Sequence, residues 1–518
     1  MQYSATRETR GVVNPNTVFE QVGIPGGIPS SRFDLSNQVI GTMDMGVLYP
    51  VFCRLALPGD RYQLGQRTVV RWNPLLAPIL HQVDTVFYSF FCPARLLDEN
   101  WEEWITGGLD GETAVSLTRW TSPSPNTAGS LWDWMGMPIG VTPHADYAPL
   151  ALPRAAYNFV WNSYFRDQSF QTEVDLTSDA LQYADWQKDY LASALENQQR
   201  GTAPALPVSG TTSAVWDNTT ILNNGTISSN IGVNIAGSDN KLYTNTGGTT
   251  SQNNLIGALN DNFVDLSSAT TFDISQFRLA AAMQQLMELN SRGGIRYTEF
   301  LKNGYGVSPT DSRLDRPEYI GKVTMPLIFS EVLQTSATDS QPSPQGNLAG
   351  HGIGAVEGMI GSYNVEEFGV ILTLVCHRPK AVYTQGFDRE WMPQNRYEVY
   401  HPLFANLSEQ AILKGEVYAT GVLAEDSAIW GYQARFSELR YARSRVAGLM
   451  HSDFDYWHLA RQFSSAPALG ASFLSYDSTI RKDILAAPSE PAMMVSVGNR
   501  VLVDRPIPAT PVPGLGRI

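Results

Sequence analysis

Segments rich in Val, Ile, Thr, Phe and Tyr recur along the chain, and each is bounded by Pro, Gly or Asp, as β-strands usually are. They cover residues 46–57, 67–76, 83–92, 321–335, 365–378 and 494–503. In 83–91, Val86, Tyr88 and Phe90 alternate with other apolar residues, so both faces of this strand would be apolar. Such strands are typical of a sheet covered on both sides. The pattern predicts a mainly β protein with two packed sheets.

The predicted strands are separated by up to hundreds of residues and do not alternate regularly with helices. This order argues against a parallel, doubly wound sheet. Pairing between distant strands is normal in Greek-key sandwiches. We therefore expect the N-terminal and C-terminal strands to lie together in one domain.

Apolar residues at helical spacing predict a helix that opens after Pro153, a favourable first-turn residue. Its stripe consists of Tyr157, Val160, Trp161, Tyr164 and Phe165. A third and shorter helix is predicted from Tyr456, Leu459, Ala460 and Phe463. We expect both stripes to face the protein core.

A second, longer helix is predicted from Asp273 to Asn290. Asp273 and Gln276 have the spacing of a capping box, and Gly293-Gly294 would end the helix. Its apolar stripe consists of Leu279, Met283, Leu286 and Met287. We expect this stripe, too, to face the core and to hold no cofactor.

Two segments have a different composition from the rest. Residues 1–30 are rich in Gly, Pro and polar residues without periodicity, so we expect an extended N-terminal arm. Ser, Thr, Asn and Gly supply more than half of 211–270, where Lys241 is the only cation. Such a stretch buries little apolar area. We expect 205–270 to be a surface excursion, ordered by its neighbours or else a disordered loop.

The chain is acidic, with a formal net charge of −14, and only 17% of its residues are charged. This balance argues against a protein whose main task is to grip phosphates. Seven of the 36 cationic residues are Lys and the other 29 are Arg. Arg is favoured at protein interfaces, where Lys is depleted. The excess therefore indicates extensive protein contacts, although a GC-rich coding sequence would explain it equally well.

The sequence carries none of the strong catalytic motifs of hydrolases, kinases or P-loop proteins. The glycine-rich run Gly350–Gly358 has Glu357 where a dinucleotide fingerprint needs glycine, so we interpret it as a flexible loop. A glycosidase stays open as an alternative, because its two catalytic carboxylates are usually far apart in the sequence and leave no local motif. His458 is more typical of a hydrogen-bonded structural histidine than of a ligand or base.

The three cysteines, Cys53, Cys92 and Cys376, lie far apart and match neither a disulfide framework nor a zinc motif, so they are predicted to be core residues. No metal site or cofactor is expected. The chain also has no run of about 18 apolar residues and no leader, which predicts a protein made in the cytosol with no membrane span.

One cationic cluster is conspicuous near the C-terminal third. Arg435, Arg440, Arg443 and Arg445 are interleaved with Phe436 and Tyr441. Arginine beside aromatic residues can hold phosphates and stack bases of a single strand. Glu438 lies in the same run, so ion pairing between subunits is an equal alternative. We therefore treat Arg435, Arg440, Tyr441, Arg443 and Arg445 as candidates for DNA or intersubunit contact.

Several motifs, read together, resemble the major capsid protein of microviruses, small single-stranded-DNA phages, and particularly the gokushovirus branch. They include Gly46-Val-Leu-Tyr-Pro50, Arg71-Trp-Asn-Pro-Leu-Leu-Ala-Pro78, Asn100-Trp-Glu-Glu-Trp104, Gly293-Gly-Ile-Arg-Tyr-Thr-Glu299, Asp311-Ser-Arg-Leu-Asp-Arg-Pro-Glu-Tyr319, Phe404-Ala-Asn-Leu-Ser-Glu-Gln410 and Tyr456-Trp-His-Leu-Ala-Arg461. The motifs cover nearly the whole chain in the family's order. One departure is Leu195–Arg200, where the family usually carries a Pro-Trp-Pro-Gln-like run.

This resemblance implies an eight-stranded antiparallel jelly roll with long insertions that carry helices. It implies a capsid domain over 31–518 that assembles as sixty copies, a T=1 icosahedral shell, around a circular single-stranded DNA genome. The chain would then be a structural virion protein and not an enzyme, made in the cytoplasm of a bacterial host. A small basic DNA-packing protein and a pilot or minor spike protein are further expected partners.

The excursion at 205–270 falls where gokushovirus capsid proteins carry the insertion that forms protrusions at the threefold axes. The resemblance thus implies an outward position and a role in attachment to a host cell-surface receptor. Candidate residues of the protrusion are Trp216, Asn224, Lys241 and Tyr243. A competing hypothesis is a glycan-binding or glycan-cleaving β-sandwich, in which Trp132, Trp134 and Trp216 would be sugar platforms.

Overall fold

The computed structural model describes residues 30–108, 115–121, 126–144, 147–204, 214–215, 263–264, 274–294, 296–333, 348–405, 407, 409–477 and 480–510. The chain forms two compact units. One consists of Met1–Gln198 with Arg292–Ile518, and the other of Gln199–Ser291. The expected arm at 1–30 lies almost wholly outside the described residues, as does most of 205–270.

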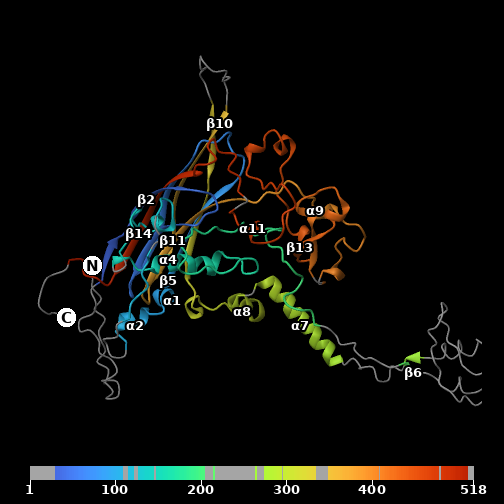
Figure 1. The fold of residues 1–518 in the computed structure, drawn as a ribbon, viewed down its shortest axis with the longest axis horizontal. Helices are drawn as coiled ribbons and strands as arrows, with labels where there is room; N and C mark the ends of the chain where they lie inside the picture. Colours follow the sequence, from blue (N-terminus) through green and yellow to red (C-terminus); the bar gives the residue numbers. More distant parts are fainter. Residues whose placement is uncertain are drawn as a thin grey trace, which may run out of the picture. The chain divides into compact units, whose positions relative to one another are not determined.

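Two antiparallel sheets form the centre of the first unit (Figure 1). The larger sheet has the order β1-β14-β4-β10-β9, and β2 also pairs with β14. Its strands are β1 (Ser31–Asp34), β2 (Asn37–Met43), β4 (Arg61–Trp72), β9 (Ile328–Leu333), β10 (Leu348–Asn364) and β14 (Met493–Arg505). The smaller sheet has the order β3-β11-β5-β8, with β3 (Tyr49–Ala56), β5 (Val83–Pro93), β8 (Glu318–Pro326) and β11 (Gly369–Pro379).

All six strand segments predicted from the sequence are strands, although 321–335 is two strands rather than one. β8 belongs to the smaller sheet and β9 to the larger, and buried Leu327 lies between them. The N-terminal strands β1, β2 and β4 all pair with C-terminal β14. The expectation that the two ends of the chain share one domain is therefore confirmed. β1 and β2 were not predicted.

The two sheets pack on each other through one hydrophobic core. The larger sheet contributes alternate residues of β4 and β14, such as Leu64, Val70 and Val497, and the smaller sheet contributes Phe87 and Ile371. Alternation along β4 and β14 places the intervening polar residues on the opposite, exposed face. The larger sheet thus has one buried face and one open face.

The Gly350–Gly358 run is not a flexible loop, because it forms part of β10, paired with β4 and β9. Its glycines permit close approach to neighbouring groups. A Cβ atom on Gly350 would lie 2.2 Å from the carbonyl oxygen of Ala77, and one on Gly354 would lie 2.3 Å from a methyl carbon of Leu327. The glycines were therefore misinterpreted as chain breakers, when they fit a crowded strand.

The smaller sheet is covered on both faces, as the sequence of 83–91 predicted. Its second face packs against a layer of helices and long loops through residues such as Phe90, Leu372 and Trp186. The main helix of this layer is α4 (Leu152–Val160), with Pro153 in its first turn, continued by a π-helical turn over Trp161–Phe165. Tyr157, Val160 and Trp161 are buried, which confirms the predicted stripe.

The other α-helices among the described residues of the first unit are short. The helices are α1 (Ala94–Leu97), α2 (Trp101–Thr106), α3 (Leu131–Trp134), α8 (Tyr297–Tyr305), α9 (Lys414–Val417), α10 (Leu423–Asp426) and α11 (Ala471–Leu474). A two-stranded sheet is formed by β12 (Gln410–Leu413) and β13 (Ile429–Gln433). Cys53, Cys92 and Cys376 are free thiols, and Cys92 and Cys376 are buried core residues as predicted.

Two helix predictions need correction. Residues 456–463 form no α-helix. A 3₁₀ turn at Asp455–Trp457 is followed by extended chain, in which the backbone of Arg461 forms a parallel β-bridge with that of Tyr383. The long helix α7 (Ile274–Gly293) does exist. Its stripe, however, does not face a core, since Leu279, Met283 and Leu286 are exposed. The described residues of the second unit are 199–204, 274–291 and the paired strands β6 (Ala214–Val215) and β7 (Phe263–Val264).

Candidate functional site

The predicted cluster at 435–445 divides into partnered and unpartnered arginines. Arg435 stacks on Phe436, 5.1 Å from its ring centre, and donates to the carbonyl oxygen of Tyr397. Arg443 donates to the carbonyl oxygen of Phe387 at 2.9 Å and lies 3.6 Å from a carboxylate oxygen of Asp388. Both arginines therefore already fix the loops of this region to one another.

Arg440, Tyr441 and Arg445 are exposed. Within the part of the chain that the structure describes, neither Arg440 nor Arg445 has an ion-pair partner. The structure thus brings the five candidates to one region but leaves only two of the four arginines available for an outside partner. Tyr441 lies between these two in sequence and is 40% exposed.

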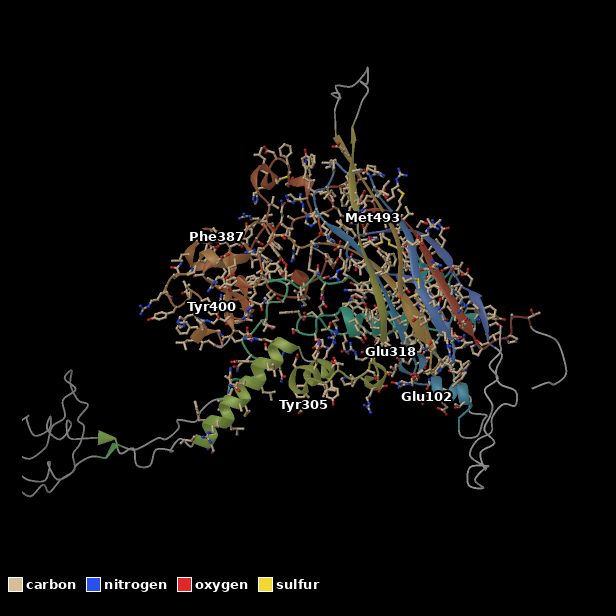
Figure 2. All side chains as sticks on the ribbon, turned by 180° about the vertical axis from the view of Figure 1, so that it is seen from behind. Glu102, Tyr305, Glu318, Phe387, Tyr400 and Met493 are labelled. Atoms are coloured by element: carbon tan, nitrogen blue, oxygen red, sulfur yellow. The ribbon has the colours of Figure 1, made fainter. Side chains whose placement is uncertain are left out.

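The surrounding segment, 387–441, carries a dense set of exposed apolar side chains, which we call the aromatic lobe. Its most exposed members are Leu423 (83%), Trp391 (80%) and Leu403 (80%). Phe387 and Tyr400, each about half exposed, are labelled in Figure 2. The other members are Tyr397, Val399, Leu407, Val422, Ile429, Leu439 and Tyr441. Exposed apolar side chains that gather on a folded protein mark an interaction surface.

Beneath the aromatic lobe, the loop layer is organised around Arg461, whose guanidinium is fully buried. It donates to the carbonyl oxygen of Phe473 at 2.6 Å and to the hydroxyl of Tyr383 at 3.3 Å. Four aromatic rings lie within 5.5 Å of the guanidinium carbon: Trp186, Tyr383, Phe463 and Phe473. A planar cation of low hydration suits such a cage. Arg461 therefore ties three distant loops together.

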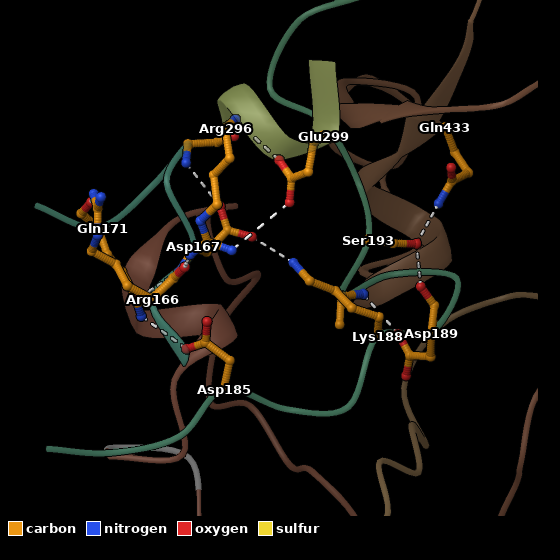
Figure 3. Close-up of polar contacts among 12 residues, drawn as sticks. Arg166, Asp167, Gln171, Asp185, Lys188, Asp189, Ser193, Arg296, Glu299 and Gln433 are labelled. Atoms are coloured by element: carbon orange, nitrogen blue, oxygen red, sulfur yellow. Dashed lines mark hydrogen bonds and ion pairs between the residues drawn. The ribbon is translucent and has the colours of Figure 1, made fainter. Parts of the chain in front are cut away.

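A group of polar residues fixes the end of the α4 helix, and Figure 3 shows two of them, Arg296 and Arg166, side by side. Arg296 donates to the carbonyl oxygens of Asn162 and Arg166, and Arg316 to that of Ser163. These carbonyls belong to the last helical turn, where intrahelical donors are missing and the helix dipole favours a cation. The two arginines thus anchor the chain where it returns from the excursion to the first unit.

The motif Gly293–Glu299 has a local explanation at this position. Gly294 has a left-handed backbone (φ +91°), which ends α7. The carboxylate of Glu299 then accepts from the backbone NH of Arg296, which caps α8. The sequence suggested the stop at Gly293-Gly294 but gave no sign of the role of Arg296.

Carboxylates surround this helix end. Lys188 forms an ion pair with Asp167 at 2.5 Å, and the side-chain amide of Gln171 donates to Asp185 at 2.8 Å (Figure 3). Burial raises the pKa of Asp185 to about 6, against the effects of the Gln171 hydrogen bond and the Lys188 charge. The network has no nucleophile paired with a base. We interpret it as structural.

The open face of the larger sheet carries arginines that the sequence reading missed. Arg61, Arg67 and Arg71 on β4 and Arg500 on β14 are exposed. None of them forms an ion pair with another described residue. The sequence did indicate this arrangement. The three arginines of β4 stand an even number of positions apart, so the alternation of a strand places them all on one face. Reading only the apolar residues of the strand concealed them.

The remaining residues singled out in the sequence either have structural roles or lie outside the described residues. Trp132 is buried and its indole donates to the carbonyl oxygen of Pro138, while Trp134 packs on Tyr49, so neither is an open sugar platform. Trp216, Asn224, Lys241 and Tyr243 are outside the described residues. His458 is buried and both ring nitrogens have backbone partners, as expected of a structural histidine.

Two general features of the described residues bear on function. No group of three or more His, Cys, Asp and Glu side chains among them is arranged to hold a metal ion. No described helix is both long and apolar enough to cross a membrane.

Comparison with known proteins identifies relatives over almost the full length. Residues 23–515 match the family model described as Capsid protein (F protein). The chain is 33% identical to Capsid protein VP1 of Bdellovibrio phage phiMH2K, over 88% of this chain and 89% of that protein. It is 30% identical to Capsid protein VP1 of Chlamydia phage 1 and 28% identical to that of Spiroplasma virus 4, in both cases over 95% of this chain and 96% of the relative.

Proposed function

The chain belongs to the phage capsid protein (F protein) family, and from this premise we propose that sixty copies assemble into a T=1 icosahedral shell around a circular single-stranded DNA genome. Its role is structural and non-enzymatic, and the protein is a component of the virion. Membership of this capsid family implies that copies of the chain assemble with one another into a shell. The number of copies and the nature of the genome belong to the proposal.

The aromatic lobe supports shell formation most directly. Trp391, Leu403 and Leu423 are each at least 80% exposed in the single chain, although burying such a side chain is worth about 1.5–3 kcal/mol. Interfaces between subunits are rich in aromatic residues and Arg, which is the composition of this lobe. We place an intersubunit contact there and assign Arg435, Arg440, Tyr441, Arg443 and Arg445 to its rim.

We assign the two packed sheets to a jelly roll. Support comes from all-antiparallel pairing, from the neighbouring positions of N-terminal and C-terminal strands, and from the passage between sheets at β8 and β9. In this scheme 1–30 is the arm, 31–518 is one capsid domain, and the excursion 205–270 is an insertion. The insertion would project outward at a threefold axis and take part in host attachment through Trp216, Asn224, Lys241 and Tyr243.

Further partners follow from the charge of the chain. A net charge of −14 cannot neutralise a packed genome, so counterions, polyamines or a small basic DNA-packing protein would do so. A pilot or minor spike protein and a host receptor complete the proposed set. Synthesis in the cytoplasm of the bacterial host is part of the same proposal.

The intersubunit assignment is tested by replacing Trp391 and Leu403 with Glu. The double variant should stay folded, because both side chains are exposed, but should fail to form shells in sedimentation velocity and negative-stain microscopy. Leu80→Glu is a matched control, since Leu80 is 70% exposed and lies outside the lobe. If the double variant assembles as well as the unaltered protein, the lobe is not an assembly contact.

A further inference from the structure

A hollow lies on the larger sheet where β14, β4 and β10 run side by side. Its cavity volume is about 870 Å³. Adjacent strands lack side chains here: Gly65 on β4 pairs with Arg500, and Gly498 on β14 pairs with Arg67. A Cβ on Gly498 would lie 2.5 Å from the carbonyl oxygen of Arg67, so this position is closed to larger residues. The flanking side chains therefore form the walls.

Two exposed arginines, Arg67 and Arg500, line this hollow. They lie on neighbouring strands and form no ion pair with a described residue. Glu357 is the single carboxylate in the lining; it faces Arg67 across the β4–β10 ladder but is not within ion-pair distance. Asp34 stands nearby on β1, and the pKa of its carboxyl is lowered by hydrogen bonds from Ser36 and, to a smaller extent, by the charge of Arg500. The hollow itself has a net positive charge in a strongly acidic chain.

The rest of the lining is uncharged and rich in hydrogen-bonding groups. Asn37 and Gln38 on β2 supply exposed amides. Gln66 and Asn499 are buried and hydrogen-bond to each other on the core side of the sheet, where Asn499 also donates to the carbonyl oxygen of Val51. Met359, 58% exposed, and Val69, 51% exposed, provide apolar surface beside these groups. Phosphate-binding cations, amides and an apolar wall thus meet in one place.

We propose that this hollow binds a short stretch of single-stranded DNA, with its phosphates at Arg67 and Arg500 and a base against the amides and Met359. Arg contacts phosphate through two parallel N–H donors. Side-chain amides match the mixed donors and acceptors of a base edge, and a polarisable thioether suits a base face. Arg61 and Arg71 continue the same exposed face of β4 and would guide the strand on either side. The inference rests on the proposed function, since it locates the genome contact of the shell.

The side chains of the hollow differ from those of the aromatic lobe, and this difference favours DNA over a protein as the ligand of the hollow. The lobe combines exposed aromatic and aliphatic side chains with arginines that are partly occupied. The hollow has two arginines without ion-pair partners among the described residues, exposed amides and no aromatic side chain in its lining, which suits a polyanion better than a protein interface.

The test measures the fluorescence anisotropy of a labelled twelve-residue oligothymidylate with the purified, unassembled full chain at a series of salt concentrations. Arg67→Gln with Arg500→Gln should weaken binding at least about tenfold. The slope of log K against log salt should become shallower by about 1.4, because two phosphate contacts of about 0.7 each are lost. Glu357→Gln should strengthen binding, because it removes the carboxylate from the lining. Misfolding can weaken DNA binding but cannot strengthen it, so the gain expected from Glu357→Gln tests the proposal independently of folding.

The matched control is Arg54→Gln with Arg313→Gln, which removes two exposed arginines elsewhere that have no ion-pair partner among the described residues and should leave both affinity and slope unchanged. Equal losses in the control and in the hollow variant would show nonspecific charge attraction and overturn the proposal. Unchanged binding in the hollow variant, or loss of shells with unchanged binding, would also overturn it; the latter would make this face a subunit contact. Shell formation by the unaltered chain, scored separately by microscopy, decides the proposed function independently.

Discussion

The loop layer and the open face of the larger sheet use arginine in opposite ways. In the loop layer, Arg461 is enclosed by four rings and two acceptors, and Arg389 neutralises the fully buried Glu416. On the sheet face, Arg67 and Arg500 are exposed and lack ion-pair partners among the described residues. The excess of Arg over Lys therefore has two origins. One set holds together loops that have little regular structure, and the other is free for an outside partner.

The largest effect should follow from Arg461→Ala, because it empties a buried cage and leaves the acceptors at Phe473 and Tyr383 unmatched. We expect a loss of about 4 kcal/mol in the free energy of unfolding, comparable to truncating a buried aromatic residue. Urea unfolding of the unassembled subunit measures it. Arg440→Ala is the control and should change stability by less than about 0.5 kcal/mol. Similar losses in both variants would erase the distinction between the two sets.

A somewhat smaller effect is expected from Arg389→Gln. Glu416 has a fully buried carboxylate that accepts from the backbone NH of Leu413 and from the hydroxyl of Tyr190 as well. Losing the arginine leaves this charge without a cation, at a cost of about 3 kcal/mol. Adding Glu416→Gln should restore part of the stability, because no buried charge then remains. A double variant less stable than the single one would contradict this account of the pair.

The loop layer should also respond to pH through Asp185. Burial raises its pKa to about 6, above the value near 3.9 of an unfolded Asp. The folded state therefore binds this proton more tightly, so the contribution of Asp185 to stability grows as pH falls from about 6 to 4 and is absent above 6. Asp185→Asn should be more stable than the unaltered protein at pH 7, and its advantage should shrink at pH 5.

Urea midpoints of both proteins at the two pH values measure this difference. His377 acts in the opposite direction, because burial lowers its pKa to about 3 and its contribution is lost as pH falls below about 6.5. It is present in both proteins and cancels in the comparison. An advantage of the variant that grows toward pH 5 would contradict the assignment.

The smallest effect on stability should come from the sheet face. Arg61→Gln with Arg71→Gln removes two exposed charges without described ion-pair partners, so we expect a change within about 0.5 kcal/mol. The same variant should nevertheless retain less oligothymidylate at low salt. A loss of several kcal/mol would show that these arginines stabilise the fold, as those of the loop layer do.

The sequence predicted the sandwich well because its strands bury alternate or continuous apolar residues, as in β4 and β5. It failed where packing requires small residues, as in β10, whose glycines approach Ala77 and Leu327 closely. It also failed at 456–463, where helical spacing coincides with an extended chain held by Arg461. The apolar stripe of α7 was correctly located on a helix but was wrongly assigned to a core.

The candidate site was predicted only in part for a related reason. The Arg and aromatic residues of 435–445 are adjacent in sequence and were therefore visible. The hollow combines β2, β4, β10 and β14, which lie far apart in the chain; Gln38 and Ser496, for example, are in contact although they are 458 residues apart. Long-range strand register, which brings such residues together, cannot be read from local patterns.

The most direct test of the account is an electron cryomicroscopy reconstruction of particles assembled from this chain. The account predicts a closed icosahedral shell of sixty copies in which Trp391, Leu403 and Leu423 are buried between subunits. The face that carries Arg67 and Arg500 should line the interior. Particles that are not closed shells, or a shell in which the aromatic lobe is free and this sheet face points outward, would contradict it.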